Sequence, residues 1–256
     1  MNLCIDVGNT SIGVGVFYND KLIKKIRLTT GLEHTEDEYF TVIKRRLEDN
    51  DIKINKIQHI ILSSVVPSVN VPLKNALKRI FNVDVISIQP GVKTGLMLKT
   101  DNPSEIGNDL IADLVGAKEE YGYPILIADL GTASKILLLD NKGVFTSCLI
   151  MPGLTLSANS LISKAALLPE VSLEAPKSIL ASNTIEAMNA GIVYGHLEMI
   201  LGLINRYENE LGYPCKHIIT GGNSVFIKDL LPKDYIYDED ICLKGLNHII
   251  NRNINK

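Results

Sequence analysis

The chain has 256 residues, with 26 Lys and Arg against 29 Asp and Glu and a formal net charge of −3. This length is enough for a substantial core in one large domain or in two closely packed halves. The interspersed charges argue against a nucleic-acid partner, and no stretch approaches the roughly 20 consecutive apolar residues of a membrane span. Four scattered cysteines and no apparent secretory signal predict a reduced, cytoplasmic protein.

Residues 1–17 predict a strand, a tight turn and a second strand, with Asp6 at the bend. Gly8 has no Cβ, so another group can approach the backbone closely. Asn9 and Thr10 offer donors that suit phosphate oxygens. Asp6 could hold a hydrated Mg²⁺, which prefers one or two carboxylates together with substrate phosphates. A plain β-hairpin turn remains the alternative.

The next segment predicts alternating helices and strands. Thr35 and Glu38 have the spacing of a capping box that opens a helix. A buried strand over 57–66, a helix from Pro67 and a strand over 83–88 follow. Such alternation predicts parallel strands with helices on the faces of the sheet.

A long connection over 89–107 leads into a helix over 106–118 with Asp109 in its first turn. Connections of this length in compact domains are usually functional or disordered. Asp109 has two interpretations: a carboxylate that compensates the helix dipole, or one that points into a ligand site.

The stretch 124–150 repeats the plan of the N-terminus. An apolar strand ends at Asp129-Leu130-Gly131-Thr132, a second strand covers 135–139, and a third covers 144–150. Two copies in register predict a duplicated unit with a nucleotide bound between the halves.

The last part predicts a helix over 154–167 and a long helix over 185–210 that Thr184 caps. The apolar stripe of the long helix indicates core packing, and Gly191 and Gly195 are spaced for close helix approach, inside the domain or across a partner. A strand over 217–220 ends at Gly221-Gly222, where a ligand or a plain turn is expected. A short helix over 224–231 and a closing helix over 244–254 complete the chain.

In their order and spacing, these motifs resemble the acetate and sugar kinase, Hsp70 and actin superfamily. Within it the chain is similar to the type III pantothenate kinases over nearly its whole length. The motifs that carry the resemblance are Asp6-Val7-Gly8-Asn9-Thr10, Asp101-Asn102-Pro103, Gly107-Asn108-Asp109, Asp129-Leu130-Gly131-Thr132-Ala133, Pro152-Gly153, Asn183-Thr184 and Thr220-Gly221-Gly222.

The resemblance implies an α/β fold of two duplicated ribonuclease H-like (actin-like ATPase) domains, each a mixed sheet flanked by helices. We expect these domains at residues 1–118 and 119–256. The implied reaction is ATP-dependent phosphorylation of pantothenate to 4′-phosphopantothenate, the first step of coenzyme A biosynthesis. The implied assembly is a homodimer with the substrate site near the subunit interface.

The resemblance also implies roles for individual residues. Asp109 would be the general base on the substrate hydroxyl, Asp6 would organise Mg²⁺, and Asp129 would ligate a monovalent cation, K⁺ or NH₄⁺. The ATP and its phosphates would contact Asp6, Val7, Gly8, Asn9, Thr10, Thr132, Gly221 and Gly222. The acceptor would contact Thr100, Gly107, Asn108, Leu110 and Thr184.

Four departures from the family pattern fall where pantothenate is expected. Leu110 stands where Arg is usual, Thr100 where many members have Tyr, Ser134-Lys135 where two threonines are common, and Ser147-Cys148 where a Gly-Gly pair is usual. Drift within the family, with Lys135 replacing the lost positive charge, is one interpretation. The alternatives are a kinase of the same fold that acts on another small alcohol, and a nucleotide-binding regulatory protein without turnover.

Overall fold

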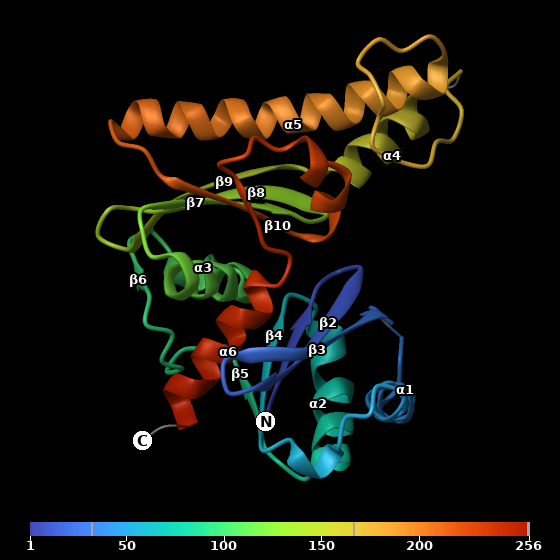
Figure 1. The fold of residues 1–256 in the computed structure, drawn as a ribbon. Helices are drawn as coiled ribbons and strands as arrows, with labels where there is room; N and C mark the ends of the chain where they lie inside the picture. The colour runs from blue at the N-terminus through green and yellow to red at the C-terminus, as the bar shows by residue number, and fades with distance from the viewer. Residues whose placement is uncertain (32, 166, 255–256) are drawn as a thin grey trace. The chain divides into compact units, whose positions relative to one another are not determined.

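The computed structural model describes residues 1–31, 33–165 and 167–254. The chain forms two compact units, each built on its own sheet (Figure 1). The first unit comprises Met1–Leu96, Asp101–Glu120 and Asp240–Lys256, and the second comprises Met97–Thr100 and Tyr121–Glu239.

The first unit contains a five-stranded mixed sheet in the order β3-β2-β1-β4-β5. β1 pairs antiparallel with β2, and β2 with β3, whereas β1, β4 and β5 run parallel to one another. The strands are β1 (Asn2–Val7), β2 (Ser11–Tyr18), β3 (Lys21–Thr29), β4 (His59–Ser64) and β5 (Val85–Ser87). The parallel strands predicted beside the hairpin are confirmed.

Helices cover both faces of this sheet. Successive strand residues point to opposite faces, so Leu3 and Ile5 pack with α1 (Glu36–Glu48) and α2 (Pro67–Phe81), whereas Cys4 packs with α3 (Asn108–Tyr121) and α6 (Ile241–Ile254). The capping box predicted at α1 is confirmed, because the Thr35 side chain accepts from Glu38 N and the Glu38 side chain accepts from Thr35 N. α2 begins at Pro67, as predicted.

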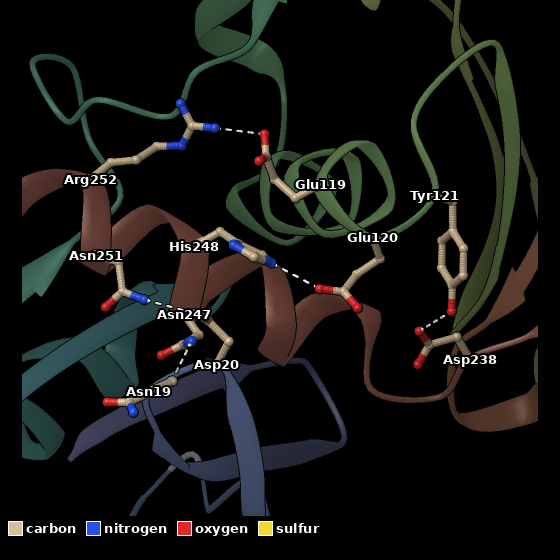
Figure 2. A network of polar contacts seen from close by, with 10 residues as sticks. All are labelled: Asn19, Asp20, Glu119, Glu120, Tyr121, Asp238, Asn247, His248, Asn251 and Arg252. Carbon is tan, nitrogen blue, oxygen red and sulfur yellow. Dashed lines mark hydrogen bonds and ion pairs between the residues drawn. The ribbon is translucent and has the colours of Figure 1, made fainter.

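The C-terminal helix α6 belongs to the first unit, although it follows the second unit in the chain. Its apolar side packs into the core with Cys4 and Phe17. Figure 2 shows polar contacts along its other sides: Asn247 Nδ2 to Asn19 O (3.0 Å), Asn251 Nδ2 to Asp20 Oδ1 (3.3 Å), His248 Nε2 to Glu120 Oε1 (2.9 Å) and Arg252 to Glu119 (2.6 Å). The units therefore differ from the expected division at residues 118 and 119, because residues 240 onward return to the N-terminal sheet.

Helices α3 and α6 touch through their backbones. A Cβ added to Gly116 would overlap Ile241 O, and one added to Gly245 would overlap Ala112 O. Only glycine permits this approach at both positions. The two glycines therefore bring α6 close enough to α3 for both helices to pack on one face of the sheet.

The second unit repeats the topology of the first. Its sheet has the order β11-β10-β7-β8-β9-β6, with β7, β8 and β9 antiparallel and β10 parallel to β7. The strands are β6 (Met97–Leu98), β7 (Ile125–Leu130), β8 (Ala133–Leu139), β9 (Val144–Pro152), β10 (Lys216–Thr220) and β11 (Ile236–Tyr237). The series β9-β8-β7-β10-β11 corresponds to β3-β2-β1-β4-β5, so the predicted duplication and the predicted fold class are confirmed.

The long helix α5 (Thr184–Leu211) runs across one face of the second sheet (Figure 1). Val193, Leu197, Ile200 and Ile204 of α5 pack with strand residues, and α4 (Leu154–Lys164) adds Leu154 to the same core. By length and composition alone α5 could cross a membrane. In the second unit, its apolar stripe forms the core with the sheet, as the sequence indicated.

Two local predictions were wrong. Asn183 rather than Thr184 caps α5, because its side chain accepts from Glu186 N. Residues 224–231 form two short 3-10 segments, η3 (Gly222–Phe226) and η4 (Lys228–Leu230), instead of one helix. The long connection also contains β6 and the 3-10 turn η2 (Pro103–Glu105), and a further turn, η1 (Ile54–Lys56), precedes β4.

We predict that Gly245→Ala destabilises the protein by about 1–3 kcal/mol, because the new methyl group overpacks against α3. The matched control is Gly202→Ala in α5, where a Cβ meets nothing within 4 Å. That variant should gain about 0.5–1 kcal/mol from the better helix propensity of alanine. Urea unfolding followed by circular dichroism measures both, and equal effects of the two substitutions would contradict the contact between α3 and α6.

Candidate functional site

In the first unit, the candidate site residues lie at the edge of the first sheet where β1 and β4 end. Asp6 lies opposite Gly13 of β2 and beside Ser63 of β4 in the strand register. Neighbouring residues on paired strands point to the same face, so Asp6 and Ser63 lie on the face that α3 and α6 cover. The Ser63 side chain is fully buried. Asp6 is half-buried and thus near the surface of this edge.

The start of α3 lies at the same edge. Asn108 Nδ2 donates to Ser64 O at 3.4 Å, which ties the first turn of α3 to the end of β4. Asp109 follows directly in that turn and is half-buried. A Cβ on Gly107 would overlap Asp109 Oδ1, so the glycine gives the carboxylate its room. The structure therefore brings Asp6, Gly107, Asn108 and Asp109 together.

The turn after Asp6 presents donors to solvent. Gly8 N donates to Ser11 O (3.0 Å), and Thr30 Oγ1 donates to Gly8 O (2.7 Å), so the turn is held from both sides. The side chains of Asn9 and Thr10 are exposed. Val7 differs from the other residues of the motif, because its side chain is fully buried in the core and its carbonyl accepts from Val65 N (3.1 Å).

The chemistry of this edge fits Mg²⁺ that is held largely by phosphate. Among the described residues, no group of three His, Cys, Asp or Glu side chains could hold a metal by itself. Mg²⁺ bound to nucleotides commonly keeps several waters and uses one or two carboxylates plus phosphate oxygens. Asp6 beside an exposed turn of donors supplies the protein part of such a site.

In the second unit, the candidate site residues lie at the end of β7. Asp129 has Lys135 of β8 on one side and Thr220 of β10 on the other. Ala128, Leu130 and Ile136 face α5, so Asp129 and Lys135 point to the opposite face. Lys135 Nζ lies 2.9 Å from Asp129 Oδ2, and the two side chains are only 17% and 13% exposed.

Two segments, η3 and the start of α4, hold the turn that follows Asp129. Asn223 Nδ2 donates to Gly131 O (2.8 Å), and Thr155 Oγ1 donates to Asn223 Oδ1 (3.1 Å). Gly153 N donates to Thr132 O (3.1 Å) at the start of α4. Sequence reasoning did not assign Asn223 or Thr155 to the site, and only the Asn that follows Gly221-Gly222 offered a signal.

Gly221 fits under the end of β7. Its φ is +90° and its ψ is 157°, a backbone conformation that is essentially restricted to glycine. A Cβ there would also overlap Leu130 N and the Asp129 carboxylate. Gly222 then begins η3. At the predicted Gly-Gly pair, the backbone of Gly221 thus packs closely against the turn that carries Asp129.

The residues expected around the acceptor fall into different environments. Leu110 is 9% exposed and carries no polar atom, so nothing at this position replaces the guanidinium. Thr100 has a buried hydroxyl without a hydrogen-bond partner among the described residues. Thr184 is exposed in the first turn of α5.

Two of the four departures from the family pattern point into the core. Ser134 Oγ lies 2.8 Å from His196 Nε2, and Ser147 Oγ lies 2.9 Å from the Tyr207 hydroxyl; both partners are on α5. Burial lowers the pKa of His196 and raises the pKa of Tyr207. Ser134 and Ser147 therefore tie the sheet to α5 and do not face an acceptor, contrary to the expectation. Lys135 alternates with Ser134 and faces the other way.

Solved structures define the class to which this fold belongs. A conserved putative Baf family transcriptional activator from Campylobacter jejuni aligns with a TM-score of 0.59 and 22% identity, over 99% of this chain and 100% of that one. A putative 2-dehydro-3-deoxygalactonokinase from Sinorhizobium meliloti also aligns with a TM-score of 0.59, at 10% identity over 100% and 98% of the two chains. The activator of the 2-hydroxyisocaproyl-CoA dehydratase from Clostridium difficile, solved with bound ADPNP, aligns with a TM-score of 0.51 and 13% identity, over 98% and 93%. The fold is that of the actin-like ATPases and sugar kinases.

Sequence relatives define the family. The family model for type III pantothenate kinase matches residues 2–206. The type III pantothenate kinase of Agathobacter rectalis is 39% identical over 253 residues, which cover 98% of this chain and 97% of that protein. That of Halalkalibacterium halodurans is 36% identical over 254 residues, 99% of this chain and 100% of that protein. The chain belongs to the type III pantothenate kinase family, as its motifs predicted.

We predict that Gly221→Ala destabilises the second unit more than Gly212→Ala does. Gly212 has left-handed helical angles (φ 74°, ψ 14°), where alanine costs about 1–2 kcal/mol from the backbone alone, and the backbone of Gly221 is less accessible still to alanine. Only at position 221 does the methyl group overlap the end of β7, which adds about 1–3 kcal/mol. Urea unfolding of the two variants measures the difference, and equal losses would show that Gly221 does not pack under the acidic turn.

Proposed function

We propose that this protein transfers the γ-phosphoryl group of ATP to the primary hydroxyl of pantothenate and releases 4′-phosphopantothenate. Its family membership supports the reaction. The observation that supports the assignment of residues is that Asp6 and the first turn of α3, which carries Asp109, lie at the same edge of the first sheet. One carboxylate can serve the phosphate-bound metal while the other serves the incoming hydroxyl.

The first unit supplies the phosphate-binding turn. The exposed side chains of Asn9 and Thr10 donate to phosphate oxygens. The backbone of Val7 and Gly8 lies beside the phosphates, because Gly8 has no Cβ. Asp6 binds Mg²⁺, which neutralises negative charge on the phosphates when it is bound. In the second unit, Thr132, Gly221 and Gly222 contact the nucleotide, because the tight turn around Gly131 leaves backbone accessible there.

Asp109 acts as the general base. Phosphoryl transfer needs a nucleophile placed in line with the leaving group, and a carboxylate relieves the hydroxyl of its proton as bonding to phosphorus develops. The proton moves from the acceptor oxygen to the Asp109 carboxylate, and the bridging oxygen leaves with ADP. Gly107 and Asn108 fix the carboxylate in the first turn of α3.

The acceptor contacts Thr100, Gly107, Asn108 and Thr184. The buried hydroxyl of Thr100 supports its assignment, since a polar atom without a protein partner is stabilised by a ligand. The Leu110 position contributes an apolar wall instead of a charge. The resemblance implies a cation, K⁺ or NH₄⁺, at Asp129. This cation would supply a positive charge there, and we propose that the reaction of this protein needs a positive charge at the same position.

The protein acts as a homodimer in the cytoplasm. The second unit exposes several apolar side chains, namely Leu156, Leu161, Leu167, Ile179, Leu180 and Ile185. A groove of about 530 Å³ on α5 is lined by Ile179, Ala187, Gly191 and Tyr194 among others. Exposed apolar side chains, one of which lines a groove, support a protein interface on this unit. Thr184 directly precedes Ile185, one of these exposed residues.

A second candidate is a kinase of the same fold that phosphorylates another small alcohol. The apolar, buried Leu110 favours it, because a site without the guanidinium holds a carboxylate-bearing acceptor less firmly.

The deciding experiment supplies purified protein with Mg-ATP, K⁺ and pantothenate and detects 4′-phosphopantothenate by mass spectrometry. A panel of small hydroxy compounds in place of pantothenate tests the second candidate. ADP formed only with another alcohol would favour that candidate. Nucleotide binding without phosphorylated product from any acceptor would point to a regulatory protein.

We predict that Asp109→Asn lowers turnover by about two to four orders of magnitude, because the isosteric amide cannot accept the proton. The control is Asp84→Asn, which removes an exposed carboxylate that pairs only loosely with Lys78 (3.2 Å) and should leave turnover unchanged. Circular dichroism checks that both variants fold. Near wild-type turnover of Asp109→Asn would rule out the base.

We also predict that Leu180→Glu weakens the dimer, because the charge enters a surface that is apolar and 86% exposed in the single chain. Light scattering after size exclusion measures the mass. Val71→Glu is the matched control, since Val71 is an exposed apolar residue of α2 in the first unit. A wild-type protein that stays monomeric at micromolar concentration would contradict the proposed dimer.

A further inference from the structure

We propose that the ammonium group of Lys135 takes the place of the monovalent cation at Asp129, so that phosphoryl transfer by this chain does not depend on K⁺ or NH₄⁺. This inference rests on the proposed function. It names Lys135 as the source of the positive charge at Asp129. The residues around Asp129 do not fit an added cation, because the positively charged ammonium group of Lys135 already contacts the carboxylate.

The contact between Lys135 and Asp129 is built into the sheet. The two residues lie directly opposite each other on antiparallel strands, β8 and β7, and their side chains point to the face away from α5. Lys135 Nζ lies 2.9 Å from Asp129 Oδ2. Directly opposed residues on one face have their Cβ atoms about 4.5–5.5 Å apart, so the strand register alone brings the two side chains together.

Burial makes this pair different from a surface ion pair. Only 17% of the Lys135 side chain and 13% of the Asp129 side chain are exposed. A charge with so little contact with water stays charged only when an opposite charge or hydrogen bonds compensate it. Substitution of Lys135 would take a compensating charge away from the buried Asp129 carboxylate, so we expect Lys135 to stay beside Asp129.

An ammonium group can do what a monovalent cation does at this position. Both carry one positive charge, and NH₄⁺ has the same nitrogen donor geometry as the end of a lysine side chain. K⁺ in contact with Asp129 would also lie close to Lys135 Nζ, and the repulsion between like charges disfavours binding. The resemblance gives threonine, a neutral oxygen ligand, at this position, whereas this chain has the cation itself.

The duplicated first unit provides an internal comparison. Asp6 occupies the place of Asp129 at the end of the first strand, and the residue opposite it on β2 is Gly13. Gly13 has no side chain to place beside Asp6, whereas the equivalent residue of the second copy, Lys135, contacts Asp129. Of the two copies, only the second thus carries a lysine opposite its aspartate.

The first test measures phosphotransfer with K⁺, NH₄⁺, Na⁺ or choline as the chloride salt at constant ionic strength. Wild-type turnover should stay within about twofold in all four salts. Lys135→Thr restores a neutral oxygen ligand and should lose at least tenfold in choline, with most of the loss recovered in K⁺ or NH₄⁺. Lys142→Thr, an exposed lysine in the turn between β8 and β9, is the control and should behave as wild type.

Lys135→Met separates charge from space. The methionine side chain has nearly the length of lysine and no charge, so it fills the same volume and leaves no place for a cation. Turnover should fall as in Lys135→Thr, but K⁺ should not restore it. Recovery of Lys135→Met in K⁺ would show that the cation acts elsewhere and would overturn the proposal.

The second readout does not depend on activity. A ligand that binds only the folded state raises the melting temperature, so KCl should raise the Tm of Lys135→Thr relative to choline chloride and leave the wild type unchanged. Titration calorimetry with Tl⁺, a K⁺ analogue, should give heat with the variant alone. K⁺-specific stabilisation of the wild type would overturn the proposal, even where Lys135→Thr does not fold. Failure to form phosphopantothenate in any salt would instead contradict the proposed function.

Discussion

In both units, the position of the acidic residue depends on one constraint. This constraint is the register between a short β-hairpin and the parallel strand beside it. In each unit the first strand pairs antiparallel with the second and parallel with the fourth of the series, and the first strand ends at an aspartate. Because side chains alternate along a strand, a shift by one residue would bury the carboxylate among core side chains. The apolar residues before Asp6 and Asp129 have 0% exposure on both faces, and they fix this register.

The same backbone plan gives the two aspartates different environments. Beside Asp6 stand a glycine on β2 and a serine on β4. Beside Asp129 stand Lys135 and Thr220, and the turn after it is closed by Asn223 and Gly221. The duplication thus kept the geometry of the backbone, while the residues at the opposed positions differ: a glycine faces Asp6, and a lysine pairs with Asp129.

Much of the fold could be predicted from the sequence, because local signals and long-range packing agree there. Thr35 and Glu38 have capping-box spacing, and the repeat of strand, acidic turn and strand marks the duplication. The place of α6 could not be predicted, since it depends on Gly116 and Gly245 meeting across helices that are far apart in the chain. Gly191 and Gly195 were easier to notice by their spacing, yet a Cβ on either meets nothing within 4 Å.

The site was predictable in its motifs but less so in its contacts. The acidic turns and Asp109 stand out as residue types at a bend or a helix start. Asn223 is marked in the sequence only by its place after Gly221-Gly222, because its role follows from a hydrogen bond to Gly131 O on another strand connection. Ser134 and Ser147 were expected near the acceptor and instead bind His196 and Tyr207 of α5. The distance of a residue from a motif along the sequence does not show to which face of the sheet its side chain points. Only the strand register shows this.

The interpretation that Lys135 replaces the arginine absent at Leu110 competes with its contact to Asp129. Lys135 Nζ lies 2.9 Å from Asp129 Oδ2, so much of its charge is matched inside the second unit. Leu110 is buried and apolar and contributes no charge. We therefore propose that an acceptor carboxylate is held by neutral donors such as the Thr100 hydroxyl, which bind a carboxylate more weakly than a guanidinium does. On this proposal the loss falls on the affinity for the acceptor, whereas the roles proposed for Asp6 and Asp109 in phosphoryl transfer are unaffected.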